Sequence, residues 1–132
     1  MRALKFPYLA YKGIPCPIVK VALRGLWGWF PILAYVDSGA TYSLFSIQLA
    51  EEIGLRYARG RPDHVVIGDG SAIPVYLHRL PLRIGPHQLR VTVGFSPRLG
   101  VRFNLLGRRD IFSRFDVTFS DSRKTLIFSP VS

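Results

Sequence analysis

The chain has 132 residues and a formal net charge of +10, from 18 lysines and arginines against eight aspartates and glutamates. This length predicts one domain over residues 1–132 and leaves little room for a two-lobed architecture. The 48% content of hydrophobic residues excludes an intrinsically disordered chain.

The composition also argues against disulfides, metal sites and membrane-spanning segments. The single cysteine, Cys16, excludes an internal disulfide, and three scattered histidines give no metal-ligand spacing, so we expect no metal and no cofactor. The uncharged stretch 25–36 is too short for a spanning helix and contains Pro31. The first residues lack the apolar segment of a secretory signal, which favours a cytoplasmic protein with no membrane span.

The basic charge raises the question of an acidic partner. Arginines are scattered along the chain, and no recognised nucleic-acid motif accompanies them. A solvated basic surface is therefore the favoured interpretation, and we expect no specific nucleic-acid binding. A nucleic-acid-binding accessory protein stays as a third alternative.

Apolar alternation with period two predicts a mostly β fold. In chain order, the expected strands are 18–24, 30–36, 80–84, 89–95, 116–119 and 125–128, of which 30–36 is an apolar run and is expected to be buried. Gly-containing turns at 25–28 and 85–87 join neighbouring strands into meanders. Two short helices are expected, one over 47–53 that Ser46 caps and Gly54 ends, and one over 109–115.

Asp37 follows the strand 30–36 directly and opens the sequence Asp37-Ser38-Gly39-Ala40. A carboxylate delivered among apolar residues is costly unless it is neutralised, paired or hydrogen-bonded, so Asp37 is expected to need a partner. The plainer interpretation is a turn-forming aspartate whose carboxylate binds local amides.

Two further features follow Asp37 in a fixed order. They are a glycine-bearing hairpin at 65–71 and the segment Asn104-Leu105-Leu106-Gly107-Arg108. Together with the Asp37 turn they resemble the retroviral-type, or retropepsin-like, aspartic proteases. The resemblance extends over about 18–128 and implies a single-lobe closed β-barrel of the acid-protease fold, with one or two short α-helices, active as a homodimer.

The resemblance also implies roles for individual residues, acting on a polypeptide substrate. Asp37 would be the catalytic acid. The residues that would support the catalytic loop are Ser38, Gly39, Leu105, Leu106 and Gly107. The residues that would bind substrate are Gly39, Ala40 and Thr41 in the loop and Ile67, Gly68, Asp69, Gly70 and Ser71 in a flap over it.

The chemistry requires two acids. Attack of water on a peptide carbonyl needs a base for the water proton and an acid for the carbonyl oxygen, which two adjacent carboxyls sharing one proton supply. This chain has one such turn, so the second acid is expected from another copy in a C₂ homodimer. The alternative is a catalytically inactive protease-like module for dimerisation or peptide binding.

Some positions depart from the viral pattern. The residue after Ala40 is Thr41, where the viral enzymes carry an acid, so Arg108 is expected to lack the ion pair made there. Pro130 is expected to interrupt the ladder of the terminal strand, which puts the terminal-strand dimer interface in doubt.

Other side chains are read more plainly. The histidines His64, His78 and His87 are expected at surface or edge positions without a role. Trp27 and Trp29 flank Gly28 in an expected exposed turn, where partial packing is favoured over a partner surface.

Overall fold

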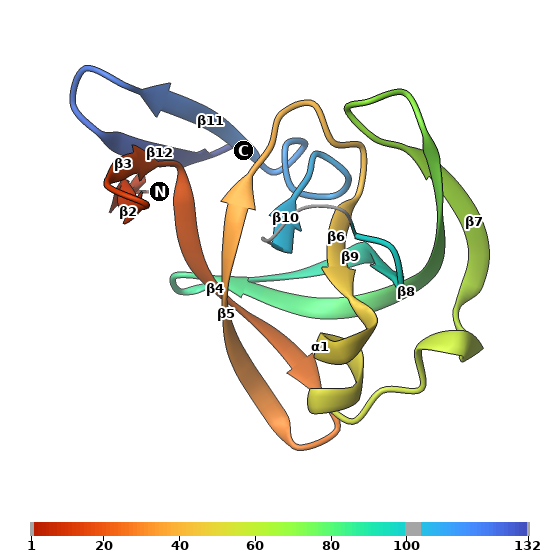
Figure 1. Cartoon of the computed structure of the whole chain (residues 1–132). Helices are drawn as coiled ribbons and strands as arrows, with labels where there is room; N and C mark the ends of the chain where they lie inside the picture. The colour runs from red at the N-terminus through yellow and green to blue at the C-terminus, as the bar shows by residue number, and fades with distance from the viewer. Residues whose placement is uncertain (1, 100–103, 132) are drawn as a thin grey trace.

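The computed structural model describes residues 2–99 and 104–131 and consists mainly of β-strands (Figure 1). Within the described residues, the strands are β1 (Leu4–Pro7), β2 (Leu9–Tyr11), β3 (Ile14–Cys16), β4 (Ile18–Gly25), β5 (Gly28–Val36), β6 (Ser43–Ser46), β7 (Arg61–Val66), β8 (Ala72–Ile84), β9 (His87–Ser96), β10 (Asn104–Leu106), β11 (Phe115–Ser120) and β12 (Thr125–Pro130). The helical elements are α1 (Ile47–Glu52) and the short 3₁₀ helix η1 (Tyr57–Arg59).

Six strands close into a barrel. Their order is β4-β5-β10-β6-β9-β8, and β8 pairs back onto β4 through Ala22 with Arg83 and Leu23 with Leu82. β7 adds to the far part of β8 and so extends the sheet beyond the ring. The closed β-barrel expected from the sequence is confirmed.

The barrel interior is built from the alternate residues of its strands. Val19, Val21 and Leu23 of β4 point inward and are almost fully buried, while Lys20 and Arg24 are exposed. The strand β5 differs from the expectation, because it is buried on one face and not on both: its residues 32, 34 and 36 are buried, whereas residues 31 and 33 are exposed. No helix in the described ranges covers its outer face, so the apolar run marks a half-buried strand.

The first expected helix is present. Ser46 lies in extended backbone before α1, and its Oγ accepts a hydrogen bond from the Leu49 amide at 3.2 Å. Gly54 follows the helix with a φ of +78°, the left-handed conformation that ends helices at little cost for glycine. None of the helices in the described ranges is long and apolar enough to cross a membrane.

The second expected helix, 109–115, is wrong. This segment forms consecutive turns, with the amides of Phe112 and Phe115 bonded to the carbonyls of Arg108 and Ile111. Asp110 has a φ of +65°, which no α-helix accommodates. Its carboxylate accepts the Thr92 amide of β9 at 2.9 Å, so a tertiary contact overrides the local helical pattern.

A separate sheet joins the two ends of the described chain, in the order β1-β12-β11 (Figure 1). The expectation that Pro130 interrupts the ladder is wrong, since β12 runs to Pro130, which pairs with Phe115 of β11. The pairing of β12 with β1 ends at Phe128. Pro130 therefore lies beyond β1, where the strand needs no amide donor on that side.

Tyr8, which follows β1, contacts Asp121 in the turn between β11 and β12, and this contact should be visible in the titration of its phenol. Its hydroxyl donates to Asp121 Oδ1 at 2.9 Å, and burial, this hydrogen bond and the Asp121 charge raise the pKa of Tyr8 to about 12. Since the folded pKa exceeds the unfolded value, the stabilisation is complete below about pH 10 and is lost as the pH rises through about 12. Absorbance at 295 nm, compared between the wild type and Tyr8→Phe, should show one phenol titrating near pH 12; a Tyr8 phenol that titrates near pH 10 would contradict the contact.

Candidate active site

Asp37 sits where β5 leaves the barrel. The Asp37 amide donates to the Leu106 carbonyl at 3.0 Å, which continues the parallel pairing of β10 with β5. Its Oδ1 accepts the Gly39 amide at 2.9 Å, and the Ala40 amide donates to the Asp37 carbonyl at 3.2 Å. Asp37 is half-buried, so the carboxylate is oriented by its own loop and still reaches solvent.

The segment after β10 holds the rest of this loop by its backbone. The Arg108 amide donates to the Ala40 carbonyl at 2.9 Å, and the Arg109 amide donates to the Thr41 carbonyl at 2.8 Å. The side chain of Arg108 is exposed and has no ion pair with any described residue, in line with a threonine at position 41. Residues 106–109 therefore fix the path of residues 37–41.

Gly107 is the closest approach between the two segments. A Cβ there would lie 2.3 Å from the Tyr42 carbonyl oxygen and 2.9 Å from the Ala40 carbonyl oxygen. The Gly107 amide donates to Ser43 Oγ at 3.0 Å, and Ser43 is fully buried. Only glycine fits this position without moving the backbone.

The glycine-bearing hairpin lies between β7 and β8. The Ile67 amide donates to the Ser71 carbonyl and the Gly70 amide to the Ile67 carbonyl, both at 2.9 Å, and Gly70 has a φ of +85°. Asp69 Oδ1 accepts the Ser71 amide at 2.8 Å and the Ser71 hydroxyl at 2.5 Å. The hydrogen bonds from Ser71 lower the pKa of Asp69, which keeps a negative charge at the tip of the hairpin.

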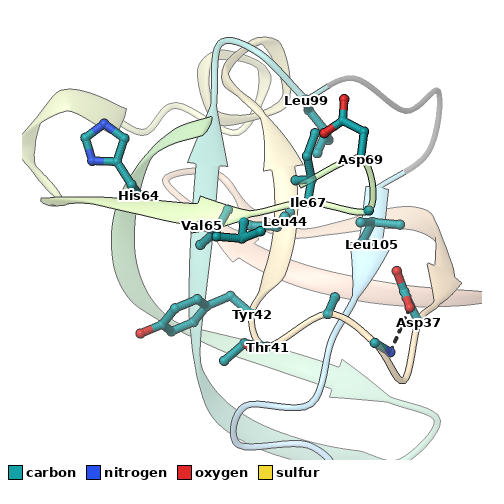
Figure 2. A pocket seen from close by; sticks show the side chains of 14 residues that line it. Asp37, Thr41, Tyr42, Leu44, His64, Val65, Ile67, Asp69, Leu99 and Leu105 are labelled. Atoms are coloured by element: carbon teal, nitrogen blue, oxygen red, sulfur yellow. Dashed lines mark hydrogen bonds between the residues drawn. The ribbon is translucent and has the colours of Figure 1, made fainter. Parts of the chain in front are cut away.

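Loop and hairpin enclose a cavity of about 780 Å³, with Ile67 and Asp69 across from Asp37 and Thr41 (Figure 2). The predicted site residues that line this cavity are Asp37, Gly39, Ala40, Thr41, Ile67, Gly68, Asp69 and Leu105. Those that do not are Ser38, which is exposed in the loop, Gly70 and Ser71 beyond the tip, and Leu106 and Gly107 beneath the loop. Leu106 is fully buried in the barrel core.

Sequence reasoning missed part of the lining. The further residues that face the cavity are Tyr42, Leu44, His64, Val65, Val66 and Leu99. Leu44 belongs to the short strand β6 and packs in a small cluster with Ile73, Val75 and Leu77. A four-residue strand carries too little alternation to be recognised, and His64, which was assigned no role, lies at the exposed rim (Figure 2).

The described residues place no second acid beside Asp37. Asp69, the other carboxylate of the cavity, is bound to Ser71 and points away from Asp37 (Figure 2). Asp110 binds the Thr92 amide and Arg79, and Arg79 Nη1 lies 3.4 Å from Asp110 Oδ2.

The phenol of Tyr35, two residues before Asp37, has a raised pKa. Burial is the largest cause, followed by the charges of Cys16 and Asp37.

Comparison with known families identifies the combination. A family model described as aspartyl protease matches residues 19–109, which contain the Asp37 turn, the hairpin and the Leu105-Leu106-Gly107 segment. The chain belongs to the aspartyl protease family. None of the curated proteins matches the sequence significantly.

Solved structures agree with this aspartyl protease assignment at the level of the fold. A retropepsin-like aspartic protease from Rickettsia conorii is 15% identical, with a TM-score of 0.64 over 96% of this chain and 91% of that one. The EIAV protease in complex with the inhibitor HBY-793 is 17% identical, with a TM-score of 0.55 over 76% of this chain and 88% of that one. The chain has the retropepsin-like fold expected from its sequence.

The contact at Gly107 predicts a sharp difference between two glycines of this aspartyl protease. Gly107→Ala should destabilise the fold by about 1–3 kcal/mol, because the added methyl meets backbone atoms that cannot rotate away. Gly68→Ala is the matched control, since a Cβ there has nothing within 4 Å and should change stability by no more than about 0.5 kcal/mol. Urea unfolding measures both, and equal effects would contradict the close approach.

Proposed function

We propose that the protein is a homodimeric aspartic endopeptidase that hydrolyses peptide bonds with one Asp37 from each subunit. The observation that carries the proposal is the position of Asp37: the loop and the segment 106–109 hold its backbone, its carboxylate is accessible, and it borders an apolar cavity under a hairpin. Membership of the aspartyl protease family supports the same chemistry.

The second carboxylate comes from a second copy. Ser38 and Gly39 are exposed beside Asp37, so the outer side of the loop is free to meet the same loop across a two-fold axis. The Ser38 hydroxyl would then bond the partner's loop. Gly39, which has no side chain, allows the substrate backbone to come close to both carboxylates.

Hydrolysis then needs no cofactor. The ionised carboxylate takes a proton from water as the water oxygen bonds to the peptide carbon, and the protonated partner gives its proton to the carbonyl oxygen. As the tetrahedral intermediate collapses, the carboxylate that is now ionised takes a hydroxyl proton and the other carboxyl gives its proton to the amine nitrogen, so the carbonyl forms again and the C–N bond breaks. Water is consumed, and each carboxyl group returns to its starting state for the next cycle.

The substrate would bind as an extended segment. Backbone carbonyls of Gly39 and the tip of the hairpin provide partners along such a strand, in the manner of strand addition. The side chains of Leu44, Ile67, Leu99 and Leu105 line the cavity and would accept apolar substrate residues. The carbonyls of Ala40 and Thr41 already accept the amides of Arg108 and Arg109, so these two residues would shape the substrate site more than they would hydrogen-bond the substrate.

Asp37→Asn should abolish cleavage of a peptide library and leave the fold and the dimer intact, because an amide can neither give nor take the proton. Asp63→Asn is the matched control: Asp63 is exposed, and among the described residues its Oδ1 accepts the neighbouring His64 amide alone, so activity should persist. Mass spectrometry of the products, with sedimentation for the dimer, gives the readout. A dimer whose wild type yields no Asp37-dependent products would favour a peptide-binding module without activity.

Mixing the two forms tests the shared site. If each site takes one Asp37 from each subunit, equal amounts of wild type and Asp37→Asn that exchange freely leave about a quarter of the dimers active. The activity should then fall to about half of that shown by the same amount of wild-type protein mixed with buffer alone. Activity that stays constant on mixing would show that one subunit suffices.

A further inference from the structure

The β4–β5 turn exposes two large apolar side chains, Leu26 and Trp27. Among the described residues, Val66 of β7 is the one other large apolar side chain that is as accessible. Leu26 is 70% exposed and Trp27 is 75% exposed, between Gly25 and Gly28, which close the turn. The turn is anchored, since the Leu26 amide donates to the Ile53 carbonyl at the end of α1 at 2.8 Å. The protein therefore holds an apolar tip out into solvent in a defined position.

Two arginines lie directly behind this tip. Arg24 pairs with Trp29 across the hairpin, and the guanidinium carbons of Arg83 and Arg24 lie 4.1 Å and 5.7 Å from the Trp29 ring centroid. Neither arginine has an ion pair within the described chain. The arginine–tryptophan stack thus fixes two uncompensated positive charges next to the apolar tip.

The same outer face of the barrel carries further positive charge. Lys20 lies on the same face of β4 as Arg24. Arg90 of β9 pairs with Pro81, which lies on the same face of β8 as Arg83. Lys20 and Arg90 are both exposed. Two carboxylates, Glu51 and Glu52, are exposed on α1, whose end anchors the turn through the Ile53 carbonyl. The net charge of +10 extends the field in the same sense.

We propose that the β4–β5 turn and the arginine–tryptophan stack behind it dock the protein on an anionic phospholipid surface. Leucine and tryptophan are suited to the region between headgroups and acyl chains, and cations one step behind them sit at the level of the phosphates. A nucleic acid would satisfy the charges but would leave the Leu26 side chain without an apolar environment. A lipid surface satisfies both parts of the patch.

The position of the tip keeps the cavity free. β5 begins at the turn and ends at Val36, directly before Asp37, and its nine residues at about 3.3 Å each separate the turn from Asp37 by about 30 Å. Figure 1 shows the turn and the loop after β5 at opposite ends of the barrel. A docked molecule would present its Asp37 loop away from the lipid, so binding and peptide hydrolysis are separate properties.

Vesicle sedimentation tests the proposal with phosphatidylcholine vesicles that contain or lack 30% phosphatidylglycerol, a composition chosen for the assay. The wild type should bind the anionic vesicles and bind less at high salt. Leu26→Ser with Trp27→Ser should weaken binding on the order of tenfold or more, and Arg24→Gln or Arg83→Gln should each weaken it about fivefold. Ile14→Ser and Arg123→Gln, which remove an exposed apolar residue and an exposed cation elsewhere, are the controls and should bind as the wild type does.

The depth of the tip gives a second measurement. In a Trp29→Phe variant, Trp27 is the remaining tryptophan, and brominated lipid should quench its fluorescence. Equal binding to neutral and anionic vesicles, no binding at all, or full binding by the Leu26→Ser, Trp27→Ser variant would each overturn the proposal. So would a dimer in solution that dissociates in this variant, because the tip would then be a contact between copies.

Discussion

The structure of the site depends on one backbone contact, the ladder between residues 106–109 and the Asp37 loop. Three amide-to-carbonyl bonds of 2.8 to 3.0 Å join Leu106 to Asp37, Arg108 to Ala40 and Arg109 to Thr41. They form only because Gly107 brings no Cβ against the carbonyls of Ala40 and Tyr42. The half-buried Asp37 is thereby positioned by main-chain atoms, and among the described residues its carboxylate accepts the Gly39 amide alone.

Under the proposed mechanism, one chain provides only half of the site. The loop, the cavity and the hairpin are formed, but Asp69 is the one other described acid that lines the cavity, and it is bound to Ser71. In the proposed homodimer, a two-fold axis beside Ser38 would supply the second acid without any new element. The strand β5 then connects two separate surfaces, the Asp37 loop at its end and the apolar, basic tip at its start.

Errors of the sequence-based prediction have physical causes. The segment 109–115 has the apolar spacing of a helix, yet the contact of Asp110 with the Thr92 amide makes it a series of turns. Pro130 reads as a strand breaker, but it lies in β12 beyond the end of β1, where no amide is required. The strands β6 and β10 were missed because three or four residues carry too little periodicity, and the neighbours that make them strands are distant in sequence.

The sequence by itself determined the alternating strands, the capped helix after Ser46, and the family, through the Asp37 turn, the hairpin and the Leu105-Leu106-Gly107 segment in that order. These depend on local conformation and on side-chain type, which the residues state directly. Only the tertiary structure decided which side chains share the cavity and that Trp27 stands exposed while Trp29 lies under two arginines. Such facts depend on which strands become neighbours when the barrel closes, and pairing between segments up to 70 residues apart leaves no local mark in the chain.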